Sequence, residues 1–307
     1  MSRRGDAQDR RKIDGILLLD KPAGISSNQA LQRARRIFNA RKAGHTGSLD
    51  PLATGLLPIC FGEATKLSAF LLESNKTYWV ECKLGEGTST GDSEGEIIST
   101  ASVPTLNHKQ IDSVLNTFLG ETDQVPPMYS AIKKQGKRLY QLAREGQYIE
   151  REARCIQIYS LQLENYNSPI LSFKLTCSKG TYVRVLAEDI ARSLGTVTHV
   201  TALRRLVAGP FGPTGMLTLE ELEQARAEGE SSLDSLLLPV DAALLDVPKV
   251  ELNEDTAYYL RHGQAVQVPK APTSGAVRIY ELSGRFLGMG EIAEDGKVMP
   301  KRLIAGQ

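Results

Sequence analysis

The chain carries at residues 44–66 the stretch GHTGSLDPLATGLLPICFGEATK. In its first 18 residues the only acidic side chain is Asp50, which is followed by Pro51. An Asp–Pro pair is typical of a helix start, with the aspartate as the N-cap and the proline in the first helical position. On residue types alone, a helix cap is therefore the favoured interpretation of Asp50.

The alternative is a loop that leads into a buried strand. Gly55 and Pro58 would interrupt a helix within two turns, and residues 56–61 form an apolar run of strand length. The residue before a proline is disfavoured in the right-handed helical region, so Asp50 would be held extended. The glycines of the GHTG run would let a ligand approach the backbone closely.

The GHTGSLDP run resembles the GHTG(T/S)LDP signature of the TruB-type tRNA pseudouridine synthases, in which the aspartate is catalytic. Further blocks resemble this family in the same order from Gly15 to about Arg302. The resemblance reverses the preference at Asp50 in favour of a catalytic loop. It implies an α+β pseudouridine synthase fold: a central mixed, mainly antiparallel sheet flanked by helices, an RNA-binding insertion and a small C-terminal PUA-like β-barrel.

Length and composition fit one large domain and one small one. The chain has 307 residues, of which 41% are hydrophobic and 24% charged, enough for a full core. Its four cysteines lie far apart without CxxC spacing, which argues against a zinc site and a disulfide framework. The first residues, MSRRGDAQDRRK, lack the apolar core of a signal peptide, and no later run approaches membrane-spanning length. We expect a cytoplasmic protein with no membrane association and no metal or other cofactor.

The formal net charge is only +1, but the charge is unevenly distributed. Residues 133–154 contain seven basic and three acidic side chains, whereas residues 220–255 contain two basic and eleven acidic ones. One surface can therefore attract phosphate while another repels it.

Local patterns place the main elements. Residues 15–20 and 77–84 read as strands, and Ser26 or Ser27 is expected to cap a helix that buries Ala30, Leu31, Ala34 and Ile37. Helices are also expected at 109–119, after the turn at 178–181, after a capping box at Thr218, and after Asn253. We expect a flexible basic arm at 1–12, a catalytic domain at 13–247 with an insertion at about 124–154, and a C-terminal domain at 248–307.

Tyr78 and Arg184 each allow two interpretations. A tyrosine in an apolar strand is more often a core residue with a tethered hydroxyl, whereas the resemblance places Tyr78 in the uridine pocket against the base. Arg184 at a helix start would ordinarily form an ion pair with Glu188, one turn on. The resemblance instead implies that Arg184 pairs with Asp50, so the implied catalytic residues are Asp50, Tyr78 and Arg184.

The resemblance also implies substrate-binding residues. Tyr182 would line the pocket, Leu203 and Val183 would keep it dry, and His45 would contact the RNA and occupy the space left by the flipped base. Lys21 and Lys66 are plausible phosphate or structural contacts. In the loop LGEGTSTGDSEG, Ser89 stands where the family usually has a further aspartate; although Asp92 remains, we expect no catalytic role for this loop.

The segment QVPPMYSAIKKQGKRLYQLAREGQ interleaves basic residues with tyrosines, as expected where side chains meet phosphates and bases. It resembles the insertion that closes on RNA in the family. A charged surface hairpin and helix would have the same composition, so the residues alone leave both interpretations open.

The activity implied is isomerisation of uridine to pseudouridine at position 55 in the T-loop of tRNA, with a flipped-out uridine and Asp50 as nucleophile. The implied partner is tRNA, with no protein partner and a monomeric enzyme. Two rivals are a non-catalytic tRNA-folding module and a nucleoside hydrolase. The second would need another catalytic carboxylate and a water site, which the central stretch does not offer.

Overall fold

The computed structural model describes residues 10–134 and 136–305. Its helices are α1 (Ser27–Ile37), α2 (Ser68–Glu73), α3 (His108–Thr117), α4 (Leu139–Arg144), α5 (Val183–Ser193), α6 (Leu219–Glu228), α7 (Glu230–Asp234) and α8 (Glu254–Arg261). Short 3-10 helices lie at Gly62–Leu67 (η1) and Ala242–Leu244 (η2).

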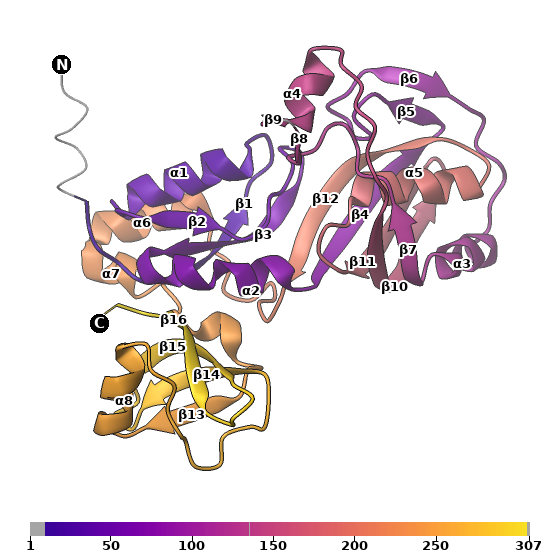
Figure 1. Cartoon of the computed structure of the whole chain (residues 1–307). Coiled ribbons are helices and arrows are strands. Elements are labelled where there is room, and N and C mark those ends of the chain that lie inside the picture. Colours follow the sequence, from indigo (N-terminus) through magenta and orange to yellow (C-terminus); the bar gives the residue numbers. More distant parts are fainter. Residues whose placement is uncertain (1–9, 135, 306–307) are drawn as a thin grey trace.

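In this described part, one eight-stranded sheet forms the centre of the molecule (Figure 1). Its order is β1-β3-β12-β4-β11-β10-β7, with β2 paired to β3. Only the β12–β3 contact is parallel, so the expected mixed, mainly antiparallel sheet is confirmed. The strands are β1 (Gly15–Lys21), β2 (Ala43–His45), β3 (Thr54–Phe61), β4 (Lys76–Leu84), β7 (Gly120–Gln124), β10 (Arg154–Asn167), β11 (Ile170–Cys177) and β12 (Thr198–Ala208).

Strand β3 is buried on both faces of the sheet. Leu57, Ile59 and Phe61 belong to the larger hydrophobic core, while Leu56 and Cys60 belong to a second core on the other face. Asp50 lies in the irregular segment between β2 and β3 and caps no helix, so the helix-cap interpretation is wrong. The loop that leads into a buried strand is confirmed.

Local sequence signals are reproduced closely. Ser26 and Thr218 each form a capping box, with Gln29 and Glu221 respectively, and Asn253 caps α8. Alternation along β4 buries Tyr78, Val80, Cys82 and Leu84, as expected. Helix α5 packs against β12 and α3 against β10, which closes one face of the sheet.

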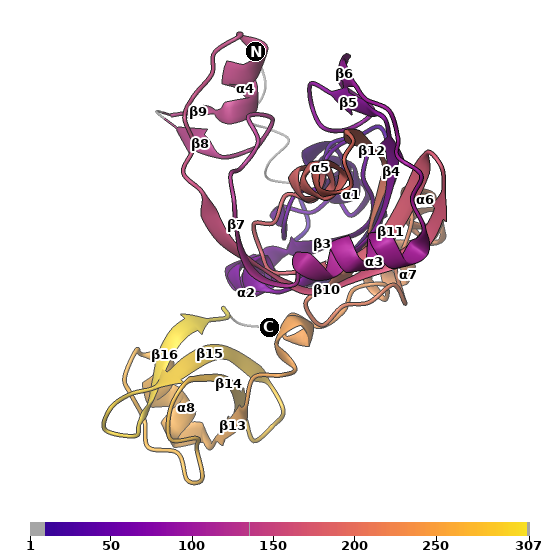
Figure 2. The same cartoon turned by 90° about the vertical axis from the view of Figure 1, so that its right-hand side faces the viewer.

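The insertion stands away from the sheet as a hairpin followed by a short helix. Strands β8 (Lys133–Lys134) and β9 (Lys137–Arg138) pair and lead into α4. A second hairpin, β5 (Glu86–Thr88) with β6 (Ile97–Thr100), projects at the same end of the molecule, and Figure 2 shows the two facing each other above the sheet. The pocket described below lies beneath the insertion.

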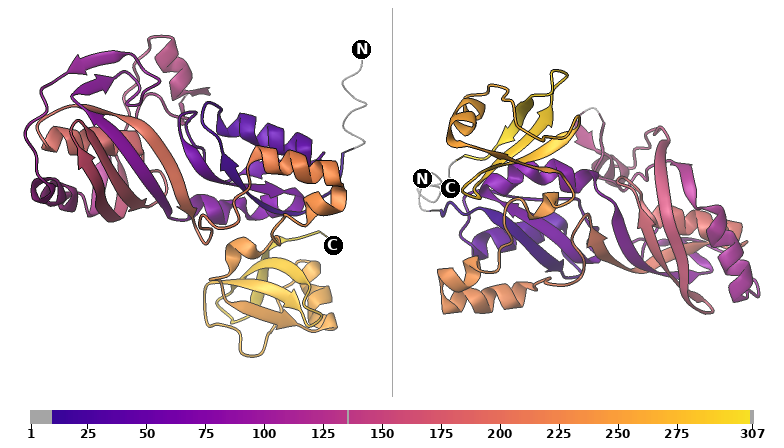
Figure 3. Two further views of the ribbon diagram at one scale, coloured as in Figure 1. Left: turned by 180° about the vertical axis from the view of Figure 1, so that it is seen from behind. Right: turned by 90° about the horizontal axis from the view of Figure 1, so that it is seen from below.

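The C-terminal unit contains β13 (Lys249–Leu252), β14 (Ala276–Glu281), β15 (Phe286–Ile292) and β16 (Val298–Leu303), packed with α8 around a separate core. Among the described residues these strands form an open path in the order β13-β14-β15-β16, so a closed barrel is not shown. Met289 and Phe286 of this unit pack with residues of η1 and η2 in the second core of the large sheet. The left view of Figure 3 shows the unit below the large sheet.

The expected N-terminal arm is described only from residue 10 onwards, so residues 1–9 of that prediction lie outside the described residues. Arg11 forms ion pairs with Glu230 and Asp234, which tie the start of the described chain to α7. Within the described ranges, no helix is both long and apolar enough to span a bilayer.

The sharp turn into β3 depends on a glycine. Gly55 has φ of 95°, and a Cβ there would lie 2.3 Å from the Arg205 carbonyl oxygen. Gly24 has a similar φ of 79°, but a Cβ at that position would have no neighbour within 4 Å. We therefore expect Gly55→Ala to lower the free energy of unfolding by at least about 2 kcal/mol more than Gly24→Ala.

Urea unfolding of both variants measures this difference. Gly24→Ala is the matched control, because it pays the left-handed backbone strain of about 1–2 kcal/mol without a steric clash. Equal losses in the two variants would show that packing against β12 does not constrain this turn.

Candidate active site

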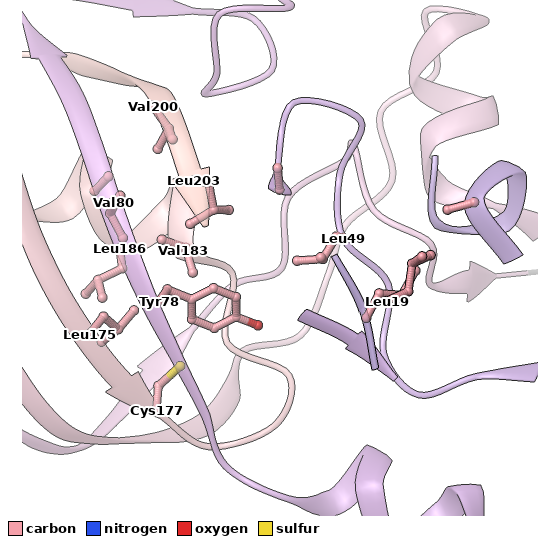
Figure 4. Packing of buried hydrophobic residues seen from close by; sticks show 14 of the residues in the cluster. Leu19, Leu49, Tyr78, Val80, Leu175, Cys177, Val183, Leu186, Val200 and Leu203 are labelled. Atoms are coloured by element: carbon pink, nitrogen blue, oxygen red, sulfur yellow. The ribbon is translucent and has the colours of Figure 1, made fainter. Parts of the chain in front are cut away.

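A cavity of about 300 Å³ opens where two strands of the sheet meet three other segments. The loop before β3 contributes Gly47 to Asp50, the start of α5 contributes Tyr182 to Arg184, and the base of the insertion contributes Tyr129 to Ala131. Strands β4 and β12 form its wall with side chains that include Tyr78 and Leu203. In Figure 4 the Tyr78 ring reaches from β4 towards Leu49, with its hydroxyl at the tip.

Arg184 connects the segments around this cavity through its ion pairs and hydrogen bonds. Its Nε lies 3.0 Å from Asp50 Oδ2, and only 7% of its side chain is exposed. Its terminal nitrogens donate to the carbonyl oxygens of Thr90 at 2.5 Å and Tyr129 at 3.0 Å. The ion pair of Arg184 is thus with Asp50, as the resemblance implied, and no ion pair to Glu188 occurs in the described structure.

Asp92 is a site residue that the sequence reasoning missed. Its carboxylate is 2% exposed and lies 3.4 Å from Arg184 Nη1, while Thr90 Oγ1 and the Glu94 amide donate to its other oxygen. The expectation that this loop has no catalytic role rested on Ser89 and stays a prediction. In the structure, Asp92 brings this loop into contact with Arg184.

The electrostatic balance at Asp50 is set by burial and by Arg184. Withdrawal of water raises the pKa of the Asp50 carboxyl above its ordinary value, the Arg184 charge opposes that rise, and Asp92 adds to it. The carboxylate still has 42% of its side chain exposed, on the side that lines the cavity. It can therefore reach a ligand there.

Two tyrosines line the same cavity. Tyr78 is buried, and burial raises its pKa while the adjacent Arg205 guanidinium opposes that shift. Tyr182 is fixed through its backbone, because Gln124 accepts from its amide at 2.7 Å and donates to its carbonyl at 3.1 Å. Both residues line the cavity, so their rings can contact a ligand there.

Leu203 and Val183 form the apolar side of the cavity, as expected. Both are buried, and both belong to the larger hydrophobic core. Their placement near Tyr78 is visible in Figure 4. The cavity thus has one polar side, at Asp50 and Arg184, and one dry side.

Lys21 lies beneath the Asp50 loop rather than on the surface. Its side chain is 0% exposed, and Nζ donates to the carbonyl oxygens of Pro22, Pro51 and Ala53 at 2.8, 3.3 and 2.7 Å. Burial lowers its pKa to about 8, although Asp50 raises it. Of the two roles expected for Lys21, this geometry supports the structural one.

His45 ends β2 beside the cavity loop. Burial lowers its pKa, with Arg205 and Arg138 acting in the same direction, so the neutral ring is favoured. Its Nδ1 is buried with no hydrogen-bond partner in the described structure.

Lys66 is not brought to this cavity. Its Nζ contacts Glu63 at 2.6 Å and the Leu303 carbonyl at 2.9 Å, and Glu63 also accepts from the Ala305 amide. These contacts join η1 to the C-terminal unit. Lys66 is therefore a docking residue in this structure.

Two further cavity residues, Arg205 and Lys76, were not identified as site residues from the sequence. Arg205 shares a strand face with Leu203, and Lys76 shares one with Tyr78, so the two-residue period carried the signal. Both line the cavity and both are buried. As to metals, residues 10–134 and 136–305 contain no group of three or more His, Cys, Asp or Glu side chains suited to hold an ion.

Comparison with known protein families finds three consecutive matches. Residues 35–183 match the TruB family pseudouridylate synthase N-terminal domain, residues 184–245 match the tRNA pseudouridylate synthase B C-terminal domain, and residues 248–304 match the C-terminal domain of pseudouridine synthase II TruB. Together they cover the cavity and the C-terminal unit.

Curated relatives are similar in sequence over nearly the whole chain, and solved structures are similar in fold. The chain is 55% identical to the tRNA pseudouridine synthase B of Nitrosococcus oceani, over 99% of this chain and 98% of the relative. It is 52% identical to that of Pseudomonas aeruginosa strain UCBPP-PA14, over 96% and 97%. Its fold is similar to chains in a Cbf5–Nop10–Gar1 complex (TM-score 0.72, 24% identity, 95% and 84% covered) and in an H/ACA RNP bound to a substrate RNA containing 2′-deoxyuridine (0.73, 22%, 95% and 85%).

The raised pKa of Asp50 has a consequence for stability at different pH values. The folded state binds the Asp50 proton more tightly than the unfolded state, so the Asp50 contribution to stability falls as pH rises from 3.8 through the folded pKa. Asp50→Asn removes this penalty. We expect the free energy of unfolding of the variant, relative to that of the wild type, to increase as pH rises from about 4 to 7.

Denaturant unfolding of both proteins at several pH values measures the difference. Asp189→Asn serves as the control, because its partner Arg192 is an exposed residue of the same helix. If the free energy of unfolding of Asp50→Asn instead falls relative to that of the wild type as pH rises, the Arg184 contact outweighs burial at Asp50.

Proposed function

Because the chain belongs to the TruB family of pseudouridylate synthases and is therefore an isomerase, we propose that it converts the uridine at position 55 in the T-loop of tRNA to pseudouridine. The names of its curated relatives support tRNA as the substrate. The observation that carries the proposal is the Asp50–Arg184 pair at 3.0 Å, in a cavity that also holds Tyr78.

Asp50 is the nucleophile in this proposal. The reaction breaks the bond from uracil N1 to ribose C1′, turns the base, and rejoins it through C5. Asp50 attacks either uracil C6 or ribose C1′, and both routes need the ionised carboxylate. Arg184 supports that form, because its charge lowers the pKa that burial raises.

Tyr78 stacks on the extruded base and is placed to move a proton during rearrangement. Tyr182 and Leu203 complete the walls of the base pocket, and Val183 helps to exclude water. Flipping a base from a stack costs a few kcal/mol and costs less in a structured loop. A T-loop uridine suits such a pocket because RNA readers favour unstacked bases in loops.

RNA binding involves His45 and the insertion. His45 contacts the RNA and occupies the space left by the flipped base. The insertion supplies cations and aromatic rings, and Arg144 and Arg151 lie over the rings of Tyr140 and Tyr148 at 5.8 and 4.7 Å. Such pairs present both charge and a stacking surface to a nucleic acid.

The remaining expectations complete the proposal. The C-terminal unit is a PUA-like domain that begins near Pro248. The enzyme acts as a monomer on the T-arm of tRNA in the cytoplasm and uses no metal or other cofactor. The part of Lys21 in substrate binding is indirect, through its hold on the Asp50 loop.

The two rivals differ from this proposal in specific features. A non-catalytic tRNA-folding module would not need Asp50, Tyr78 and Arg184 together in one cavity, although such a role can coexist with catalysis. A nucleoside hydrolase would release free uracil. The product of the reaction therefore distinguishes all three.

Asp50→Asn is expected to abolish pseudouridine formation in a tRNA transcript, a loss of more than about 10³-fold, because the amide is no nucleophile. Binding of the transcript should persist, since the substitution leaves the basic surfaces intact. Chemical mapping of pseudouridine at position 55 and a filter-binding assay measure the two effects.

Asp189→Asn is again the control and should retain full activity, because Asp189 pairs with an exposed residue on the outer side of α5. Full activity of Asp50→Asn would contradict the assignment of Asp50 as the nucleophile. Release of free uracil by the wild type would favour the hydrolase instead.

Replacing Lys133 and Lys137 by Gln tests the insertion. Both side chains are exposed on the hairpin. If they neutralise phosphates, the slope of log binding constant against log salt should become shallower by about 1 to 2 units.

The matched control variant replaces Lys109 and Lys174 by Gln. Lys174 is exposed on β11 and pairs across the sheet with Trp79, so it faces away from Tyr78. Unchanged slopes in both double variants would count against a role of the insertion in phosphate contact.

A further inference from the structure

Arg205 and Lys76 are two buried cations on one wall of the cavity. Arg205 is 1% exposed and Lys76 6% exposed. Arg205 lies opposite Tyr78 in the β12–β4 register, and Lys76 precedes Tyr78 by two residues on the same strand. All three side chains therefore share one face of the sheet, and all three line the cavity.

Neither cation has a carboxylate partner in the described part of the chain. Arg205 donates to the carbonyl oxygens of Leu56 at 2.6 Å and Gly47 at 3.1 Å. Lys76 donates to those of Leu71 at 3.1 Å, Leu72 at 2.8 Å and Ser74. Their hydrogen bonds are thus made to carbonyl dipoles and not to a carboxylate.

This arrangement is costly for the fold. A buried cation without a counter-ion loses hydration that carbonyl dipoles only partly replace. Lys76 shows the cost, since burial lowers its pKa to about 8, with Arg205 acting in the same direction. Arg184 differs, because it forms ion pairs with Asp50 and Asp92. An unbalanced pair of cations in a catalytic cavity points to a negative charge that forms there during the reaction.

We propose that Arg205 and Lys76 stabilise the negative charge that develops on the uracil ring when its bond to the ribose is broken. This inference rests on the proposed function. When the N1–C1′ bond breaks, its electron pair leaves with uracil and spreads over N1 and the ring oxygens. The new C5–C1′ bond then forms, C5 loses its proton and N1 gains one, so the sum is an isomerisation.

The same wall serves both routes open to Asp50. If the carboxylate adds first to C6, the ring becomes an enolate with its charge on an oxygen. If it attacks C1′, the departing uracil carries the charge. In each case a fixed cation in a water-poor cavity stabilises the transition state more than the neutral substrate.

The first test compares Arg205→Gln, which keeps hydrogen-bond donors, with Arg205→Lys, which keeps the charge. Arg205→Gln should slow the single-turnover rate by on the order of 100-fold. It should leave the dissociation constant for tRNA unchanged, and Arg205→Lys should recover at least about tenfold of the loss. Equal rates for Gln and Lys variants that fold and bind tRNA normally would overturn the charge role.

Arg204→Gln is the control. Arg204 is the neighbour of Arg205 but points to Asp20, to which it makes two hydrogen bonds at 3.0 and 2.7 Å. Loss of a partly exposed ion pair should change the rate by less than about fivefold. A loss in Arg204→Gln as large as in Arg205→Gln would mean that β12 is merely distorted.

Lys76→Gln provides an independent arm on another strand, so the proposal stays testable if an Arg205 variant does not fold. It should also lower the single-turnover rate by at least about tenfold with tRNA affinity retained. Circular dichroism melting confirms folding of each variant. A folded Lys76→Gln enzyme with the wild-type rate would exclude Lys76 from the charge-stabilising wall.

A substrate with 5-fluorouridine at the target position separates charge from shape. The fluorine stabilises the ring anion intrinsically, so the Arg205→Gln defect in cleavage of the N1–C1′ bond should shrink by at least about tenfold. A defect of equal size on both substrates would contradict the proposal. If the wild-type enzyme forms pseudouridine but these differences between variants are not observed, only the charge-stabilising role of Arg205 and Lys76 is contradicted. If Asp50→Asn stays active, the proposed function is contradicted.

Discussion

The guanidinium of Arg184 is the constraint on which the site depends. A buried guanidinium must have partners for its donors, and here they come from three separate segments: Asp50 before β3, Thr90 and Asp92 after β5, and Tyr129 at the base of the insertion. None of these segments can move away without leaving a buried charge unpaired, which costs several kcal/mol. Catalytic loop, hairpin loop and insertion are thereby held in one geometry.

A second layer of cations holds the Asp50 loop from behind. Lys21 binds the carbonyls of Pro51 and Ala53, while Arg205 binds those of Gly47 and Leu56. These four carbonyls flank Asp50 on both sides in the sequence. An irregular loop cannot satisfy its own backbone groups as a helix or sheet does, and buried side-chain donors supply what is missing. The carboxylate is therefore preorganised before any substrate arrives.

The sequence predicts what is local and fails where distant segments decide. Capping boxes at Ser26 and Thr218 and the alternation along β4 depend on residues a few positions apart, and all are confirmed. Asp50 and Arg184 were paired only through a family resemblance. The two-residue period puts Arg205 on the face of Leu203 and Lys76 on the face of Tyr78, but only the register of β12 against β4 joins these faces in one wall, and no local pattern specifies that register. For Lys66 the sequence left a phosphate and a structural contact open, because its partner Leu303 lies 237 residues away.

The cost of this site is offset by the strand that follows the Asp50 loop, which is buried in two hydrophobic cores. Four buried cations, Lys21, Lys76, Arg184 and Arg205, lie around two carboxylates from separate loops, Asp50 and Asp92, and such a cluster is destabilising unless packing elsewhere offsets it. Strand β3, which follows the Asp50 loop directly, sends Leu57 and Ile59 into one core and Leu56 and Cys60 into the other. Apolar burial on both faces contributes about 25 cal/mol per Å², enough to hold one end of the loop firmly. A strand buried on one face only would leave the same charges on a segment free to open, and the excess positive charge beside Tyr78 would then draw in water rather than act on a bound base.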